Sequence, residues 1–253
     1  MIEKHMRAVQ YLAGMLMLLA AWGQSAMGAE NSQVVPIGYS QNGRYFAYEE
    51  FGRNDTEKSV YSKIYMVDLE EVSQVVGTPV LNQAAQDRLS LFQVREQTRQ
   101  DAQIYLDSLR ITHPAIIAAM IGDGQPDADR SHISFGVPSI RIDGKIVGRY
   151  DLSLETFETA SAMDCEPYLD QPPRGMKLIM ENFGTRLEAY KDGALPRSRE
   201  CPFAYQLTGV VLPFAATDIS NSVALISVLT RGLAGVQRHF LAIPLAFQIR
   251  SRN

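Results

Sequence analysis

The sequence lacks the short motifs that mark common catalytic sites. It contains no G-x-S-x-G elbow, no S-x-x-K, no H-E-x-x-H, no Walker loop and no G-x-G-x-x-G turn. His113, His132 and His239 are scattered along the chain, without a partner at metal-ligand spacing. We therefore predict no catalytic, cofactor-binding or metal-binding residues, although single carboxylates from distant strands could still converge.

An excess of positive charge is also absent. The formal net charge is −4, and the first 28 residues hold one Glu, one Lys and one Arg, so their removal would leave −5. A mildly acidic chain lacks the excess of basic residues that binding to nucleic acid or anionic lipid requires, so we expect no nucleic-acid partner. The only local basic excess is interpreted as solvated surface and comprises Arg197, Arg199, Arg250 and Arg252.

Long apolar runs are missing apart from Ala8–Gly23, a run of 16 residues near the N-terminus. Lys4 and Arg7 precede it and Ala26-Met27-Gly28 follows it, which is the order of a secretory signal. An uncleaved anchor is the alternative, but spanning a bilayer takes roughly 20 residues. We predict a signal peptide over residues 1–28 and a single secreted β-rich domain over residues 29–253. No integral membrane span is expected after cleavage.

Cysteine is scarce, with only Cys165 and Cys201 in the whole chain. An even number of cysteines in an oxidising compartment favours pairing, which would stabilise the fold by roughly 3–4 kcal/mol in the chain-entropy model. Two free buried thiols are the alternative. Neither cysteine lies in a C-x-x-C motif or near a histidine, so metal or redox chemistry fits poorly.

Carboxylates occur in three suggestive groups. Glu49 is adjacent to Glu50, and Glu70 to Glu71, so on a strand each pair points to opposite faces and does not act jointly. The acidic run from Asp123 to Asp129 lacks the turn glycine and distant glutamate of an EF-hand. We interpret it as a solvated loop, with calcium binding as the alternative.

What the chain does contain is a series of short strands joined by tight turns. Residues 37–51 are typical of a hairpin that turns at Ser40–Gly43, with Phe46 and Tyr48 on one face. Core packing explains the aromatic residues there, and a sugar- or peptide-binding surface is the alternative. Further hairpins are predicted around Asp143-Gly144 and residues 182–184, and the last strands are expected at Phe203–Phe214, Val223–Thr230 and Phe240–Ile249.

Glycine and proline are absent between Leu81 and His113, where a helical pattern appears. Apolar residues recur at steps of three, four or seven, which predicts one long amphipathic helix near 82–110 with Asn82 as its N-cap. It is expected to pack on a sheet face, with partner binding as the alternative. The predicted fold is mainly β (α+β), with antiparallel strands in a propeller-like or sandwich arrangement.

Two resemblances follow from these stretches. Tyr39–Tyr48 is similar to the hairpin found once per blade in TolB-type propeller repeats, although no second copy is visible. The order of motifs along the chain resembles a bacterial family of predicted secreted proteins catalogued as a domain of unknown function. The stretches that carry this second resemblance are Gly38–Gly52, Tyr61–Asp68, Gly77–Pro79, Leu195–Tyr205 and Arg231–Ala242.

The family resemblance implies export and a shared β-rich fold, and it implies no activity. We interpret the chain as a periplasmic or secreted protein that acts as a non-enzymatic binding or scaffold module of the cell envelope. Its expected partner is an envelope protein or a glycan. The alternative is an envelope hydrolase acting on glycan or peptide, for which Glu49, Glu50, Asp68 and His113 are the residues to locate.

Overall fold

The computed structural model describes residues 31–125, 127–139, 144–232 and 235–245. The predicted signal peptide lies outside these residues and stays a prediction. The described chain forms one α-helix, α2 (Leu91–Ser108), and one short 3-10 helix, η1 (Arg197–Arg199). Its strands are β1 (Asn31–Ser40), β2 (Tyr45–Asn54), β3 (Ser59–Asp68), β4 (Ser73–Gln74), β5 (Val80–Ala85), β6 (Ile111–Met120), β7 (His132–Pro138), β8 (Ile146–Glu158), β9 (Arg174–Asn182), β10 (Thr185–Lys191), β11 (Pro202–Pro213), β12 (Val223–Gly232) and β13 (Gly235–Pro244).

The strands make two antiparallel sheets. The larger sheet has nine strands in the order β13-β12-β11-β6-β1-β2-β3-β4, with β5 also paired to β3, and it curves into a half-barrel. Strand β6 links its two halves, because residues 111–114 pair with β1 whereas residues 115–120 pair with β11. The smaller sheet has the order β10-β9-β8-β7.

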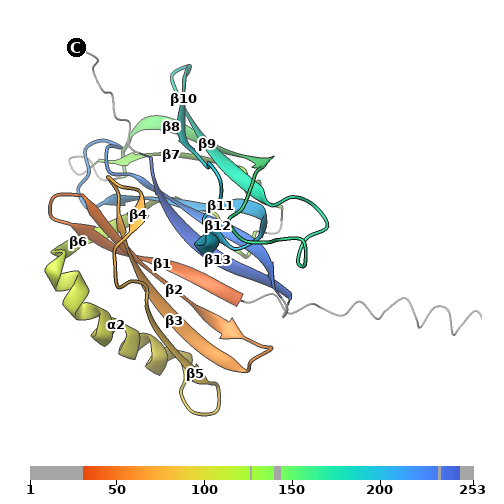
Figure 1. Ribbon diagram of the computed structural model, residues 1–253. Helices are drawn as coiled ribbons and strands as arrows, with labels where there is room; N and C mark the ends of the chain where they lie inside the picture. The colour runs from red at the N-terminus through yellow and green to blue at the C-terminus, as the bar shows by residue number, and fades with distance from the viewer. Residues whose placement is uncertain (1–30, 126, 140–143, 233–234, 246–253) are drawn as a thin grey trace, which may run out of the picture.

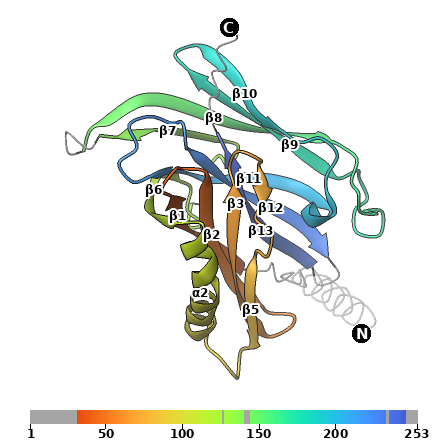
Figure 2. The same cartoon turned by 60° about the vertical axis from the view of Figure 1, so that its left-hand side comes forward.

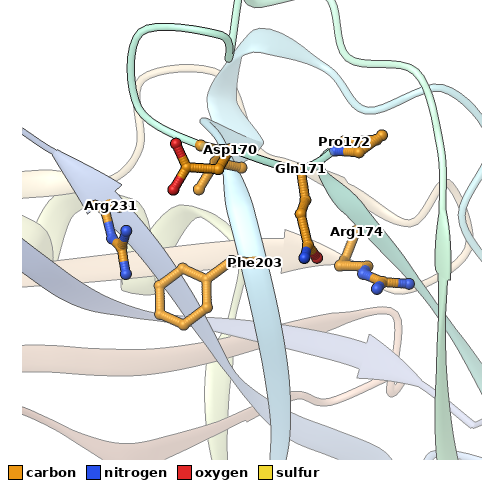
Figure 3. Close-up of a pocket in the computed structure, with 7 residues that line it drawn as sticks. Asp170, Gln171, Pro172, Arg174, Phe203 and Arg231 are labelled. Atoms are coloured by element: carbon orange, nitrogen blue, oxygen red, sulfur yellow. The ribbon is translucent and has the colours of Figure 1, made fainter.

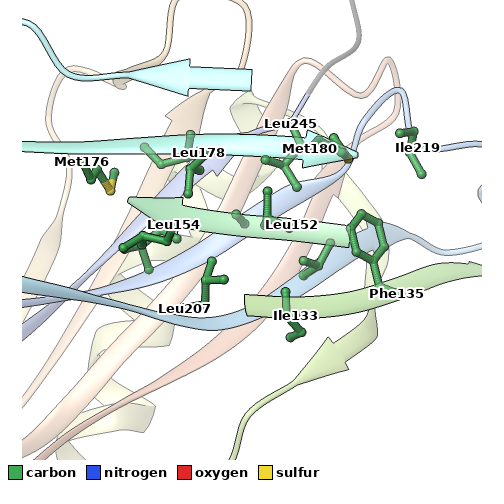
Figure 4. Close-up of a cluster of buried hydrophobic side chains, with 14 of the residues drawn as sticks. Ile133, Phe135, Leu152, Leu154, Met176, Leu178, Met180, Leu207, Ile219 and Leu245 are labelled. Carbon is green, nitrogen blue, oxygen red and sulfur yellow. The ribbon is translucent and has the colours of Figure 1, made fainter. Parts of the chain in front are cut away.

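Three apolar clusters hold these layers together. Figures 1 and 2 show the four-stranded sheet on one side of β11–β13 and helix α2 on the far side, against β3 and β5. The largest cluster lies between the two sheets, where Leu152, Leu178 and Leu207 are fully buried (Figure 4). A second, aromatic cluster fills the half-barrel around Phe46 and Tyr48, and a third lies under the helix. The fold therefore stacks the helix, the half-barrel and the four-stranded sheet in that order.

The predicted hairpins are confirmed where the structure describes them. β1 and β2 pair across the turn at Ser40–Gly43, in which the Gly43 amide donates to the Ser40 carbonyl oxygen over 2.9 Å. Gly43 has a φ of +74°, which an L side chain rarely adopts. The hairpin of β9 and β10 turns at Phe183 and Gly184, both with positive φ. Asp143 lies outside the described residues, but β7 and β8 pair on either side of it.

The predicted helix exists, but its expected start is wrong. Residues 80–85 form β5, which pairs with β3, so Asn82 lies in a strand. The true N-cap is Ser90, which makes a capping box with Gln93. The helix ends at Ser108, close to the predicted end near residue 110, and Pro114 lies inside β6. Strand β6 was not expected.

The sheets do not have the radial arrangement of a propeller. The described strands form one half-barrel and one four-stranded sheet stacked on it, so the likeness of Tyr39–Tyr48 to a propeller repeat is confined to one hairpin. The coarser prediction, a mainly β fold with antiparallel strands and one helix, is confirmed. Among the described residues, no helix has the length and apolar character needed to cross a membrane.

Candidate functional site

The loop between β8 and β9, residues 159–173, is fixed to the start of β11. Cys165 and Cys201 form a disulfide bond across 36 positions of sequence, so the predicted pairing is present. A second attachment comes from the amide of Leu195, which donates to the carbonyl oxygen of Ala160 over 2.8 Å. We call residues 159–173 the disulfide loop. Its attachments hold it as a defined wall beside the sheet.

This wall borders an open cavity of about 220 Å³. Figure 3 shows Asp170 and Gln171 on the loop side, with the ring of Phe203 and the guanidinium of Arg231 side by side across from them. A second hollow, of about 420 Å³, continues along the same loop and shares residues 169–172 with the first. We call the first cavity the disulfide-loop groove, which is lined by residues 169–172, Arg174, Phe203 and Arg231.

A β-bulge places the aromatic ring in the groove. Pro202 of β11 pairs with Thr230 of β12, but the next pair is Ala204 with Leu229, so Phe203 is an extra residue without a partner. A bulge bends its strand and redirects one side chain, and bulges are common beside functional sites. The ring of Phe203 thus lines the groove because of the register shift.

The charges of the groove are only partly compensated. The guanidinium carbon of Arg231 lies 5.6 Å from the centre of the Phe203 ring, and no carboxylate within the described ranges lies within 4.0 Å of Arg231. Arg174 has a loose ion pair with Glu158, at 3.9 Å. Arg231 is therefore a cation with an aromatic neighbour and no anion.

A contrasting polar region closes the open side of the half-barrel. There β13 is an edge strand, and side chains of β1 and β2 bond to its outward backbone groups. The hydroxyl of Tyr48 donates to the carbonyl oxygen of Phe240 over 2.8 Å, and the Phe240 amide donates to Glu50 over 3.0 Å. Ser32 donates to the carbonyl oxygen of Arg238 over 2.6 Å. We call these contacts the seam, and they satisfy backbone groups that another strand would otherwise pair.

The seam also contains a chain of ion pairs. His239 Nδ1 lies 3.5 Å from Glu50 and His239 Nε2 lies 3.5 Å from Glu200, while Lys63 Nζ lies 3.3 Å from Glu50. Burial alone would raise the pKa of Glu50, but His239 and Lys63 hold it below its ordinary value. Burial lowers the pKa of His239, yet its bonds to Glu200 and Glu50 prevail and raise it to about 9. At neutral pH the seam thus holds alternating, compensated charges.

Glu49 lies on the opposite face of β2, under the helix. It accepts hydrogen bonds from Ser62 at 2.9 Å, from Arg95 at 2.7 Å and from Arg99 at 3.0 Å. Burial would raise the pKa of Glu49, but the hydrogen bond and charge of Arg95 lower it. The expectation that Glu49 and Glu50 point to opposite faces is confirmed. Both are fully buried, which the sequence did not indicate.

The other residues considered for catalysis do not join these sites. Asp68 forms an ion pair of 2.7 Å with Arg44, which also lies 3.3 Å from Glu70. His113 is exposed on β6, and His132 lies 3.9 Å from Asp151 with about half of its side chain exposed. None of these side chains lines the disulfide-loop groove.

The acidic loop is solvated as expected, whereas Arg199 of the basic stretch is not. In the acidic loop, Asp123 forms an ion pair of 2.9 Å with Arg238, so this carboxylate is tied to β13. Within the described residues, no three His, Cys, Asp or Glu side chains gather as a metal site. Arg199, predicted to be solvated surface, has a side chain only 9% exposed and lies 3.3 Å from buried Asp192.

A sequence model of the family described as "Predicted secreted protein (DUF2259)" matches residues 47–246, most of the chain. The chain belongs to this family. Membership in the predicted secreted protein family means that the protein is exported, and the Cys165–Cys201 disulfide is consistent with that compartment. No curated protein and no solved structure matches the chain.

Sequence reasoning did not identify the residues of the groove. Phe203 was expected to be an ordinary strand residue, and Arg231 was not considered at all. The available signals were the position of Phe203 two residues after Cys201 and the presence of both residues in stretches that resemble the family. Neither signal reveals the register shift that brings the ring and the guanidinium together.

Proposed function

We propose that this exported protein is a non-enzymatic binding module of the cell envelope that holds its ligand in the disulfide-loop groove. The observation that carries the proposal is the uncompensated Arg231 beside the bulged Phe203 in an open cavity of about 220 Å³. Ligand sites typically combine an apolar or aromatic surface with a few polar groups that fix orientation. The groove has this composition.

The treatment of charge elsewhere in the protein supports the proposal. Glu49, Glu50 and Asp192 are buried, and each has a cation within ion-pair distance. Arg231 differs from these groups, because it is exposed and has no anion within 4.0 Å among the described residues. An anionic group of a ligand would supply the missing partner of Arg231.

The disulfide supports a binding role in a second way. One wall of the groove is a loop, and a free loop would lose conformational entropy when it closes on a ligand. The Cys165–Cys201 bond and the Leu195–Ala160 hydrogen bond hold that loop in place beforehand. The groove is therefore preorganised, which favours affinity.

The hydrolase alternative draws on one feature, the approach of Glu50 and Glu200 to the same histidine. Glycosidic cleavage by a carboxylate pair needs one carboxyl that stays protonated as the acid. The bond to His239 lowers the pKa of Glu200, and His239 and Lys63 outweigh burial to lower that of Glu50. Both groups are ionised at neutral pH, so the seam favours a structural role over this chemistry.

Co-sedimentation tests the proposal. The purified exported protein is mixed with the envelope fraction of its host, and the pelleted amount is compared for the wild type, Arg231→Gln and Arg53→Gln. Arg53 is exposed on β2 and does not line the groove, so Arg53→Gln is the matched control. We expect Arg231→Gln alone to reduce retention at least about fivefold. Equal retention of all three proteins, or none of the wild type, would contradict the proposal.

A further inference from the structure

We propose that the ligand unit held in the disulfide-loop groove is a sugar ring that carries a single carboxylate, of the uronic-acid type. This inference rests on the proposed function and specifies the class of ligand. It follows from the charge, the surface and the size of the groove, together with the different charge of the hollow beside it.

The charge of the groove matches one negative group. Its lining contains two guanidiniums, Arg174 and Arg231, and one carboxylate, Asp170. Arg174 is partly committed to Glu158 at 3.9 Å, which leaves Arg231 as the free cation of the described lining. A guanidinium binds a carboxylate through two parallel hydrogen bonds. Because Asp170 shares the cavity, a doubly charged phosphate is disfavoured relative to a carboxylate.

The remaining lining groups suit a ring with hydroxyl groups. The carboxylate of Asp170 accepts hydrogen bonds, and the amide of Gln171 both accepts and donates them. Both residues come from the disulfide loop, and in Figure 3 the Asp170 carboxylate points to the Arg231 side whereas the Gln171 side chain extends towards Arg174 and the half-buried Phe203. A sugar ring has an apolar face for the aromatic ring and a rim of hydroxyl groups for Asp170 and Gln171.

The size of the groove fits one such unit. The open groove of about 220 Å³ has room for a single ring with its carboxylate. A longer chain would have to continue into the neighbouring hollow of about 420 Å³.

The neighbouring hollow indicates what the next unit would be. Its lining includes the carboxylates of Asp164, Glu166 and Asp170 and the hydroxyls of Thr159 and Ser161, and it includes no lysine or arginine. A second carboxylate would be repelled there, whereas an uncharged hydroxyl-rich unit would find acceptors. The two cavities therefore favour a polymer in which charged and neutral sugars alternate.

The composition of the disulfide loop disfavours an extended peptide as the ligand. Peptides that lie along a protein commonly add a strand to an exposed edge, which requires backbone N–H groups. Pro172 lines both cavities and Pro173 lines the hollow, and neither has an N–H. The wall thus offers a poor edge for strand addition, and side chains do most of the recognition.

Isothermal titration calorimetry with three probes tests the inference, namely D-glucuronate, D-glucose and N-acetyl-alanine. The wild type is expected to bind glucuronate at least tenfold more tightly than either other probe. Arg231→Gln is expected to lower the affinity for glucuronate at least tenfold, and Arg53→Gln is expected to leave it unchanged. Equal affinity for glucose, a preference for N-acetyl-alanine, or no saturable binding of glucuronate overturns the inference.

Failure of the ligand class and failure of the binding role give different results. If envelope retention depends on Arg231 but glucuronate does not bind, the sugar assignment is wrong and the binding role stands. If retention is also independent of Arg231, both are wrong. A circular dichroism spectrum and a urea midpoint like those of the wild type show that Arg231→Gln is folded, so a loss of binding cannot be ascribed to unfolding.

Discussion

The seam and the disulfide-loop groove are two polar regions of one protein, and they treat charge in opposite ways. At the seam, Lys63, Glu50, His239 and Glu200 alternate in sign at separations of 3.3–3.5 Å. In the groove, Arg231 has an aromatic neighbour and no anion among the described residues. We infer from this difference that the charges of the seam stabilise the fold, whereas the charge of Arg231 in the groove is available to a ligand. Four predictions test this contrast, from the largest expected effect to the smallest.

The largest effect is expected when a buried charge of the seam loses its counterpart. Glu50→Ala would leave Lys63 without its partner, His239 with Glu200 alone and the Phe240 amide without its acceptor, which should cost about 3–5 kcal/mol of unfolding free energy. Glu200→Ala is the control and should cost less than about 1 kcal/mol, because that side chain is 45% exposed. Urea unfolding measures both. If both variants lost the same unfolding free energy, the buried ion pairs of Glu50 would not be what stabilises the seam.

Removal of the disulfide should affect both stability and binding. The Cys165→Ala, Cys201→Ala double variant should lose about 3–4 kcal/mol, because its unfolded chain is less constrained. It should also lose envelope retention under conditions where it remains folded, since the loop wall is then free to move. Urea unfolding and co-sedimentation give the two readouts. A folded variant with undiminished retention would show that the loop does not need to be fixed.

Raising the pH should weaken the seam selectively. The pKa of His239 is raised from its ordinary 6.5 to about 9 in the folded state, because its bonds to Glu200 and Glu50 outweigh burial. The folded protein therefore holds this proton more tightly than the unfolded chain. The stabilisation is complete below pH 6.5 and is lost as the pH rises through 9, on the order of 3 kcal/mol in total.

Urea midpoints measured between pH 6 and 9.5 check this loss for the wild type and for His239→Gln. The variant should be less stable at pH 6 and should show a flatter dependence on pH. A wild-type midpoint that rises over this interval, or a variant with the same slope, would contradict the assigned ion pairs.

The smallest effect on stability is expected in the groove. Phe203→Ala and Arg231→Gln should each change the unfolding free energy by less than about 1 kcal/mol, because Phe203 is only half-buried and Arg231 is exposed and unpaired. Binding should nevertheless be lost. A cost above about 3 kcal/mol for Arg231→Gln would mean that this residue completes the fold, and the contrast with the seam would disappear.

The sequence predicts what is local in this fold. The turn at Ser40–Gly43 and the turn at Phe183–Gly184 follow from residues within four positions of each other, and both hairpins were predicted. The helix start could also have been found locally, because Ser90 and Gln93 have the spacing of a capping box. Asn82 was preferred because the absence of glycine and proline does not distinguish a helix from β5.

Contacts between distant residues could not be predicted in the same way. Glu50 was expected only to point away from Glu49, but it bonds to Phe240, 190 positions away, and is fully buried. Strand β6 was missed, and its Pro114 lies where β6 changes partner from β1 to β11. The groove forms because a register shift places the Phe203 ring in it and a disulfide holds the opposite loop. The sequence of either wall, taken alone, does not indicate a binding site.

The most direct test of the contrast is envelope co-sedimentation of Arg231→Gln beside Glu50→Gln, with the urea midpoint of each variant measured in parallel. We expect Arg231→Gln to keep a midpoint like that of the wild type and to lose retention. Glu50→Gln is expected to lose stability and, while folded, to be retained. Full retention of a folded Arg231→Gln protein would contradict the assignment of the groove as the binding site.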